Sequence, residues 1–479
     1  MITAERMAAV DENAEALGVP RKQLMESSGN AVARVVREHV DTGGRVVIVA
    51  GRGNNGGDAF VAARFLDGFD LSVHLLGRPE TITTGIAREN WEALVDAEYG
   101  TETVTDSADL SLPRCEVIVD AMLGTGVTGE LREPEATAAR EINASEAAVV
   151  SVDVPSGVDA NTGEAPDPAV DADHVVTFHD TKPGLADLDC EVTVADIGIP
   201  GTAERFVGPG DLRGIGRASD SHKGENGDVL VIGGGPFAGA PALSASAVLK
   251  AGGDLANVLC PDRVFEAVQG CGPDLIVHDV AGKRFAPDHV EEALSRAEEK
   301  DAVVLGPGLG NADETLDAVR EFLGEFEGLG VVDADALQVV PEVETGATLI
   351  CTPHKGEFER MGGERTDDPD EQAERAREYA AETGHVMLVK GPADVVSDGE
   401  RVRISRSGNP GMTVGGTGDV LAGITAAFGA VLDPFEAAAA AAYVNGLAGD
   451  AAYEEEGLGL TASTMLTQIP AAMRGATDD

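Results

Sequence analysis

The stretch that decides the fold is Arg45-Val-Val-Ile-Val-Ala-Gly-Arg-Gly-Asn-Asn-Gly-Gly-Asp58. It joins an apolar run typical of a buried strand to a glycine-rich loop at 51–58, and a run suited to a helix follows. Glycines let backbone N–H groups approach an anion, and a helix start adds partial positive charge. Asp58, which closes the loop, would repel phosphate. The segment therefore predicts a strand–loop–helix unit of an α/β domain, with an anion site that has chemistry attached.

Outward from this stretch, strand and helix patterns alternate. Two helices are expected within residues 3–39, broken at Gly18-Val-Pro20. Further strands are expected at 71–76, 116–121, 148–152 and 174–178, and helices at 59–66, 86–96 and 133–145. The block closes near 192–200. This alternation predicts a parallel sheet covered on both faces.

A second α/β series follows a polar segment at 201–227 that is rich in Gly, Asp and Arg. We therefore place a boundary near residue 213 and expect two domains, 1–212 and 213–479. The expected strands are 228–233, 255–260, 302–306, 329–333, 347–352, 386–390 and 393–397. A helix is expected at 240–251, and two Ala-rich helices at 419–432 and 435–454 close the chain.

The composition is globular but extremely acidic. Hydrophobic residues make up 43%, and 84 Asp+Glu against 35 Lys+Arg give a formal net charge of −49. Repulsion among these negative charges destabilises a compact fold, and concentrated salt screens it, so we interpret the charge as adaptation to a salt-rich cytoplasm. The charge also argues against nucleic acid or an anionic membrane as partner. The five cysteines are scattered, which predicts reduced thiols. We see no signal peptide and no membrane-spanning apolar stretch, and therefore expect a cytoplasmic protein.

The first glycine loop fits a dinucleotide fingerprint only in part. Gly51, Gly53 and Gly56 satisfy G-x-G-x-x-G, but the next strand ends at Leu76-Gly77-Arg78 without the acid that would hold a ribose. Nor does pyrophosphate binding explain the Asn54-Asn55 pair or Asp58. Two later strands end in Asp120, before the small-residue loop Gly124–Gly129, and in Asp153-Val-Pro-Ser156. These strand ends are expected to meet at one edge of the sheet.

The segments Leu24–Gly29, GRGNNGGD, DAMLGTGVTGE and VDVPSGVDANTG resemble the NAD(P)H-hydrate epimerase family, the YjeF N-terminal domain, over about residues 1–205. The resemblance implies a Rossmann-like αβα sandwich that binds K⁺ through Asn55, Asp120 and Ser156. It implies that the nucleotide hydrate contacts Asn54, Asn55, Gly56, Gly57, Asp58, Gly124, Thr125, Gly126, Val127, Thr128, Gly129, Glu130 and Asp153. Asp153 is our expected proton-transferring group. Lys182 either lies beside Asp153 as a catalytic partner or is a solvated turn lysine.

The second glycine loop, Gly415-Gly-Thr-Gly-Asp419, precedes an apolar helix. Its backbone donors suit a transferring phosphoryl group, and Asp419 is placed to take a proton from an attacking hydroxyl. The alternative is an aspartate that only caps the helix. The arrangement resembles the ribokinase-like superfamily, which implies a second αβα domain and a fold class of α/β for both domains.

Six ordered motifs narrow the resemblance to the NAD(P)H-hydrate dehydratase family over about residues 220–475: Lys223–Gly235, Gly239–Pro241, Gly306–Gly310, Asp333–Leu337, Thr352–Glu357 and Lys390-Gly391. The implied contacts of the hydrated nucleotide are Ala240, Gly308, His354 and Asp419. The implied contacts of the adenine nucleotide are Lys390, Gly391, Pro392, Ala393, Asp394 and Gly418. The family often has Thr where this chain has Asp394, and a carboxylate there would repel phosphate.

Together the resemblances imply repair of NADH and NADPH hydrates, NADHX and NADPHX, in which a hydroxyl has been added to ring atom C6. Asp419 would be the base for phosphorylation from ADP with Mg²⁺, and the first domain would interconvert the epimers. A homo-oligomer is hinted at by the dehydratase resemblance. One alternative is a vitamin-alcohol kinase with a regulatory Rossmann-like domain, and another is a scaffold of RNA metabolism. Neither accounts for Asn55, Asp120, Asp153 and Ser156 together.

Overall fold

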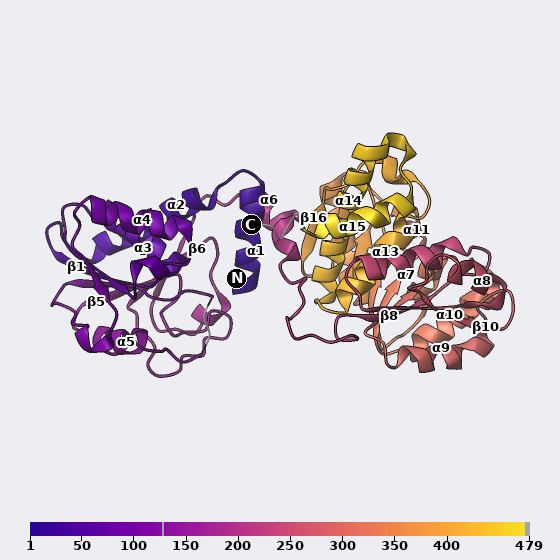
Figure 1. Ribbon diagram of the computed structural model, residues 1–479, viewed down its shortest axis with the longest axis horizontal. Helices are drawn as coiled ribbons and strands as arrows, with labels where there is room; N and C mark the ends of the chain where they lie inside the picture. Colours follow the sequence, from indigo (N-terminus) through magenta and orange to yellow (C-terminus); the bar gives the residue numbers. More distant parts are fainter. Residues whose placement is uncertain (127–128, 475–479) are drawn as a thin grey trace. The chain divides into compact units, whose positions relative to one another are not determined.

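The computed structural model describes residues 1–126 and 129–474, which form two compact units, Met1–Gly201 and one that begins at Thr202 (Figure 1). The division precedes the expected boundary near 213. Residues just after 201 belong to the second unit because Phe206 forms an isolated β-bridge with Ile404 of β16 (Val402–Ser405). The Arg406 guanidinium also lies 3.7 Å from the centre of the Phe206 ring. None of the helices in the described ranges is long and apolar enough to cross a membrane.

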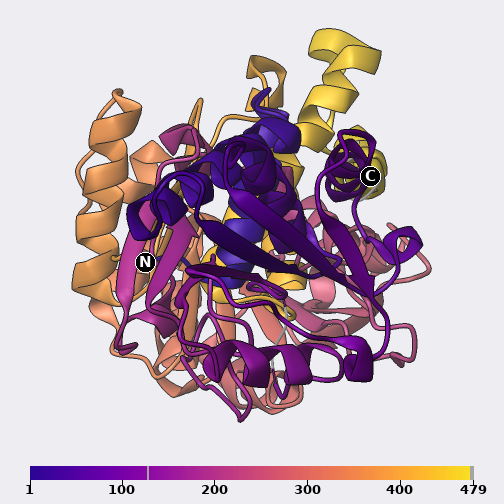
Figure 2. The ribbon, with the colours of Figure 1, turned by 90° about the vertical axis from the view of Figure 1, so that its left-hand side faces the viewer.

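Unit 1 contains a seven-stranded, all-parallel sheet in the order β3-β2-β1-β4-β5-β6-β7. Its strands are β1 Arg45–Ala50, β2 Asp70–Leu76, β3 Thr101–Val104, β4 Val117–Ala121, β5 Ala148–Val152, β6 His174–Phe178 and β7 Glu191–Ala195. Its helices are α1 Ala4–Ala16, α2 Arg21–His39, α3 Asn54–Phe65, α4 Gly85–Asp96 and α5 Glu135–Asn143, and α6 Gly201–Arg205 follows. Helices α2, α3 and α4 cover one face and α5 the other (Figures 1 and 2). The strand order reverses between β1 and β4, which places a crevice at their carboxyl ends.

Unit 2 contains a nine-stranded sheet in the order β10-β9-β8-β11-β12-β13-β14-β15-β16, in which the β14–β15 and β15–β16 pairs are antiparallel and the other pairs are parallel. Its strands are β8 Asp228–Ile232, β9 Leu255–Pro261, β10 Ile276–Val280, β11 Ala302–Leu305, β12 Leu329–Val332, β13 Thr348–Cys351, β14 Val386–Val389, β15 Asp394–Ser397 and β16 Val402–Ser405. Its helices are α7 Gly239–Lys250, α8 Asp262–Gln269, α9 Val290–Ala297, α10 Asp313–Glu325, α11 Lys355–Arg360, α12 Pro369–Thr383, α13 Thr417–Gly429, α14 Pro434–Glu456 and α15 Ala462–Arg474. Separate hydrophobic cores cover the two faces, one with α7, α13 and α14 and one with α9, α10 and α12. Both units are thus αβα sandwiches, as expected.

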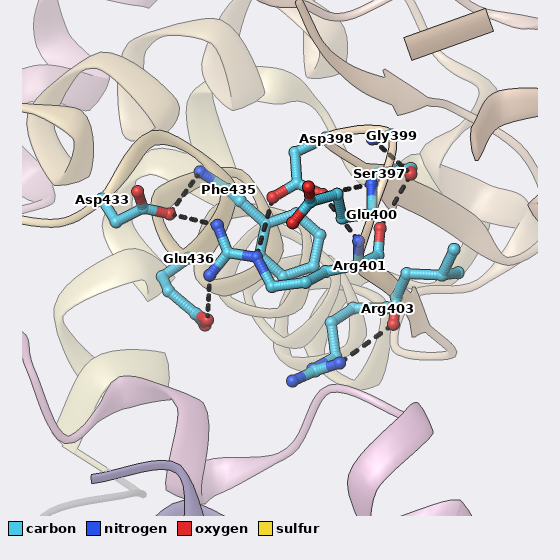
Figure 3. A network of polar contacts seen from close by, with 10 residues as sticks. Ser397, Asp398, Gly399, Glu400, Arg401, Arg403, Asp433, Phe435 and Glu436 are labelled. Atoms are coloured by element: carbon cyan, nitrogen blue, oxygen red, sulfur yellow. Dashed lines mark hydrogen bonds and ion pairs between the residues drawn. The ribbon is translucent and has the colours of Figure 1, made fainter. Parts of the chain in front are cut away.

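The tight turn between β15 and β16 is anchored to α14 by Arg401 (Figure 3). Its guanidinium donates to Asp398 at 2.7 Å, to Asp433 at 2.9 Å and to Glu436 at 3.3 Å, and it lies 4.3 Å from the centre of the Phe435 ring. One cation thus serves three carboxylates, as an acid-rich composition requires. The contact fixes the hairpin that begins at Asp394.

Two sequence expectations about the elements need correction. The chain does not close with two Ala-rich helices, because α15 follows them. The Asn-Asn-Gly-Gly-Asp segment is not a loop before a helix that starts at 59, because α3 begins at Asn54. A side chain on Gly56 would collide with the carbonyl of Gly51, and one on Gly57 would meet Met25 and Ala87. Close packing therefore requires these glycines, and it stabilises a helical turn that their low propensity disfavours.

Candidate active sites

Asp120 is the buried centre of the crevice in unit 1. It lies at the end of β4 and is fully inaccessible. Its carboxylate accepts bonds from Ser156 Oγ at 2.6 Å, Ser156 N at 2.8 Å, Ser151 Oγ at 2.8 Å and Met122 N at 3.3 Å. Burial raises the pKa of Asp120 above its usual value, although the bonds from Ser156 and Ser151 lower it. The end of β4 is therefore tied to the turn that follows β5.

Asn55 joins this group from the first turn of α3. Its Nδ2 donates to Leu123 O at 2.8 Å and to Val152 O at 2.7 Å. Its Oδ1 faces the position of a side chain at Gly124, where a Cβ would lie 2.7 Å away. The structure thus brings the ends of β1, β4 and β5 to one place, as the sequence predicts. Asn55, Asp120 and Ser156 present the oxygen donors that K⁺ prefers, so their chemistry fits that ion.

Asp153 and Lys182 form a buried ion pair at the same edge. Lys182 Nζ lies 3.0 Å from Asp153 Oδ1 and also donates to Phe178 O at 2.9 Å. Thr177 Oγ1 donates to the same carboxylate oxygen at 3.1 Å. Lys182 is fully inaccessible, so the interpretation as a solvated turn lysine is wrong. Asp153 has φ of +66°, a strained backbone conformation that is typical of functional sites.

Two further carboxyl groups share this environment. Asp58 on α3 is 7% exposed, and burial together with the charges of Asp153 and Asp11 raises its pKa well above the usual value. Asp11 on α1 has a pKa raised to about 6 by burial, although Arg21 lowers it. The amide of Ile2, just before α1, donates to Thr181 O at 2.9 Å and holds the helix here. No motif signals Asp11 in the sequence, since it is one polar position of an amphipathic helix.

The other predicted contacts of unit 1 lie around this edge. Asn54 is the exposed first residue of α3. It follows Gly53, where a Cβ would have no atom within 4 Å. The loop after β4 leaves Gly126 and Glu130 exposed. Val127 and Thr128 lie outside the described residues. Gly124, Thr125 and Gly129 flank that gap, so their contacts with a ligand stay predictions.

In unit 2, the second glycine loop forms the N-terminus of α13. Gly416 is its N-cap with φ of +100°, and Asp419 is the third residue of the helix. Ser244 Oγ on α7 donates to Asp419 O at 2.8 Å. Burial and the charge of Asp333 raise the pKa of Asp419 to about 7, although Lys390 lowers it. A carboxyl group with this pKa suits proton acceptance at neutral pH.

Asp333 and Lys390 lie against this turn. Asp333 Oδ1 accepts bonds from Thr352 Oγ1 at 2.7 Å and from Lys390 Nζ at 2.8 Å, and Asp333 is 3% exposed. A Cβ on Gly418 would lie 3.1 Å from Lys390 Nζ. Burial lowers the pKa of Lys390, but the charge and hydrogen bond of Asp333 outweigh it and leave the pKa raised. The sequence motif at 333–337 is visible, but no local signal assigns a role to Asp333.

His354 caps α11 beside Lys390. Its Nδ1 accepts from the amides of Gly356 at 3.0 Å and Glu357 at 3.1 Å, while Glu357 accepts from the His354 amide at 2.8 Å. Lys390 N donates to Pro353 O at 2.8 Å, which places the two predicted contacts side by side. Because Nδ1 is an acceptor, Nε2 carries the ring proton, and this nitrogen lies 3.4 Å from Glu357 Oε1.

The remaining predicted contacts also lie at this edge. Gly308 has φ of +73°, and a Cβ there would lie 3.3 Å from the Cβ of Ala240. Asp394 Oδ1 accepts from Gly391 N at 2.9 Å, so its carboxylate closes the turn that contains Pro392 and Ala393. Burial raises the pKa of Asp394 to about 6, although Gly391 and Lys390 lower it. This role explains an aspartate at 394 without a nucleotide contact.

The two units thus combine a Rossmann-like sheet, which carries a buried Asp153–Lys182 pair, with a ribokinase-like sheet, which carries Asp419 at a glycine-rich turn. Residues 21–184 match the family described as YjeF-related protein N-terminus, and residues 229–471 match the NAD(P)H-hydrate dehydratase family. Proteins named bifunctional NAD(P)H-hydrate repair enzyme Nnr from Pyrobaculum aerophilum and Methanothermobacter thermautotrophicus are 45% and 44% identical to this chain. The matches cover 99% and 98% of this chain and 98% and 94% of theirs. The chain belongs to this family of bifunctional NAD(P)H-hydrate repair enzymes.

Solved structures agree with the fold of unit 2. An ADP/ATP-dependent NAD(P)H-hydrate dehydratase from Bacillus subtilis, co-crystallised with ATP and Mg²⁺, has a TM-score of 0.51 at 24% identity and covers 57% of this chain and 98% of its own. A ribokinase-like superfamily protein from Enterococcus faecalis V583 has a TM-score of 0.51 at 24% identity, covering 57% and 96%. The predicted ribokinase-like domain is confirmed.

Proposed function

We propose that the chain restores hydrated nicotinamide nucleotides in two steps. Unit 1 interconverts the R and S hydrates of NADH and NADPH, and unit 2 dehydrates the S hydrate at the expense of ADP, giving AMP and phosphate. The observation that carries the proposal is that one chain holds both a buried Asp153–Lys182 pair at the strand switch and Asp419 at a phosphate-type turn beside Lys390. A vitamin-alcohol kinase would need only the second site.

In unit 2, Asp419 takes the proton of the C6 hydroxyl as that oxygen attacks the terminal phosphorus of ADP. The free N–H groups of the first turn of α13 and the ammonium of Lys390 face the transferring phosphoryl group. The electron pair of the ring nitrogen then expels phosphate from C6, and a proton leaves C5, which restores the ring of NADH. Mg²⁺ supplies neutralisation of the phosphate charge. The carboxylate of Asp333 would hold it, which leaves Asp419 to accept the proton.

In unit 1, the hydrate lies over the first turn of α3 and the loop after β4, with Asp153 as the proton-transferring group. Lys182, whose Nζ lies 3.0 Å from Asp153 Oδ1, fixes the orientation of this carboxyl group. Asn55, Asp120 and Ser156 would hold K⁺, which supplies positive charge near the substrate phosphates. The other proposed contacts from the first turn of α3 and from the loop include five glycines, Gly56, Gly57, Gly124, Gly126 and Gly129, whose backbone can approach phosphate closely.

A single assay tests both activities in the full chain. Mixed NADH-hydrate epimers are supplied with ADP and Mg²⁺ in concentrated KCl, and the return of NADH absorbance is followed. We expect full recovery by the wild type, none by Asp419→Asn, and recovery of only the S share by Asp153→Asn. Recovery undiminished by Asp419→Asn would contradict the assigned base. Activity with ATP alone would contradict the assignment of ADP.

A further inference from the structure

Asp58 on α3 is a buried carboxyl group. It is 7% exposed, and among residues 1–126 and 129–474 no hydrogen bond or ion pair reaches its side chain. By contrast, Asp153 is 9% exposed, forms an ion pair with Lys182 and accepts a hydrogen bond from Thr177. An unpaired carboxylate is costly to bury, whereas a neutral carboxylic acid is not. Burial without a partner among the described residues therefore favours the neutral form of Asp58, whereas Asp153 has the Lys182 ammonium 3.0 Å away.

The helix geometry directs Asp58 toward Asp153. Asn55 and Asp58 are three residues apart on α3 and thus share a face. Asn55 Nδ2 donates to Val152 O at 2.7 Å, so this face looks onto the end of β5, where Asp153 follows. Helix α2 packs against α3 at this turn, since a Cβ on Gly29 would lie 2.5 Å from the backbone oxygen of Asp58. The charges that act on Asp58 come from Asp153 and from Asp11 on α1, and both favour its neutral form.

We infer that Asp58 is the catalytic acid of the epimerisation and that Asp153 is its base, an inference that rests on the proposed function of unit 1. Epimerisation at C6 needs two simultaneous proton transfers, because C6 carries both a hydroxyl group and the ring nitrogen N1. Paired titratable groups whose environments hold them in opposite states supply such transfers. Among the other described residues of this edge, Lys182 is paired with Asp153, Asp120 already accepts four hydrogen bonds, and the charge of Arg21 favours the ionised form of Asp11.

The step is an isomerisation that balances without a co-reactant. Asp153 takes the hydroxyl proton, the C6–O bond becomes a carbonyl, and the C6–N1 bond breaks with its electron pair moving to N1. Asp58 gives its proton to N1. Rotation about the C5–C6 bond presents the other face of the aldehyde. In the return step N1 attacks that face, Asp58 recovers its proton from N1, and Asp153 returns its proton to the oxygen.

The inference predicts a particular pH dependence. Asp58 must be protonated to act, so the epimerisation rate falls as pH rises through its raised pKa. The Asp11 carboxylate faces Arg21, Asp153, Lys182 and His179, and its charge helps to keep Asp58 protonated. Asp11→Asn therefore moves this alkaline fall to lower pH. Asp58→Asn removes the fall and slows epimerisation by about 10²- to 10⁴-fold.

The test uses the full chain and separated hydrates. Purified R hydrate with ADP and Mg²⁺ reports epimerisation, while S hydrate reports unit 2 alone and confirms that each variant is folded. Asp67→Asn, an equal charge change at an exposed position just after α3, is the matched control and should behave as wild type. Wild-type conversion of R hydrate no faster than in buffer would refute the proposed function itself. If the wild type epimerises the R hydrate, the role of Asp58 alone would be refuted by either of two results. One is an Asp58→Asn rate within about tenfold of the wild-type rate, and the other is an alkaline fall that persists in Asp58→Asn.

An isotopic label on the C6 oxygen tests the bond that breaks. Ring opening retains the label, because the C–O bond stays intact throughout. Loss of the label to water at the rate of epimerisation would refute proton donation to N1. Retention of the label, together with the Asp58→Asn defect, supports the assigned pair.

Discussion

Replacing Lys182 with Met should destabilise unit 1 strongly. The substitution keeps much of the side-chain length but leaves the Asp153 carboxylate, 12% exposed, with only the Thr177 hydroxyl as donor. It also removes a donor from Phe178 O. Removing one partner of a buried ion pair typically costs about 3–5 kcal/mol. Adding Asp153→Asn removes the unpaired charge, so the double variant should recover a substantial part of that loss.

The chain offers a specific probe for this measurement. Trp91 on α4 is the single tryptophan of the sequence, is 4% exposed and packs on Phe60, so its fluorescence reports the unfolding of unit 1. Urea titration in constant KCl gives the free energy of unfolding. With a slope of about 2 kcal/mol per molar, the expected loss moves the midpoint by roughly 1.5–2.5 M. A loss below about 1 kcal/mol, or a double variant less stable than Lys182→Met, would refute the buried-pair argument.

Three further predictions concern unit 2 and the charge of the whole chain. The dehydration rate should rise with pH through about 7, because Asp419 accepts a proton only when ionised; a flat profile across that range would contradict its role. Asp333→Asn should move this rise to lower pH, because the Asp333 charge raises the pKa of Asp419. It should also raise the KM for ADP, because Lys390 loses its ion-pair partner. Asp335→Asn, in the same motif, is the control. The free energy of unfolding should increase as KCl is raised from dilute to molar concentration, since salt screens a net charge of −49; insensitivity to salt would refute the proposed adaptation.

The central strands could be predicted from the sequence because burial on both faces imposes continuous apolar runs. Val117–Ala121 and His174–Phe178 are fully buried and were expected within one residue at each end. The strands that were not expected, β3, β10 and β16, are three of the four edge strands of the two sheets. The sequences Thr101–Val104 and Ile276–Val280 mix charged with apolar residues because each strand has one unpaired side. Each of these segments forms a strand only because it pairs with one neighbouring strand of the sheet, and the local sequence pattern does not reveal that pairing.

The candidate sites show the same division. Asp120, Asp153 and Asp419 stand next to strand or helix ends in recognisable motifs, so their meeting at sheet edges follows from topology. Asp11 carries no such signal, because its proximity to Asp58 and Asp153 arises from how α1 docks. Asp333 was visible as part of a motif, but its bond to Lys390 joins residues 57 positions apart.

By itself, the sequence determined that the chain has two α/β domains, each with a glycine-rich turn and an aspartate where phosphate chemistry is expected. The tertiary structure decided whether Lys182 is solvated or buried, that Asn54–Asp58 is a helical turn, and which carboxyl groups are paired. The physical reason is that strand and turn preferences are local and leave a periodic record in the chain. Burial and ion pairing depend on distant segments, and they set the protonation state on which catalysis depends.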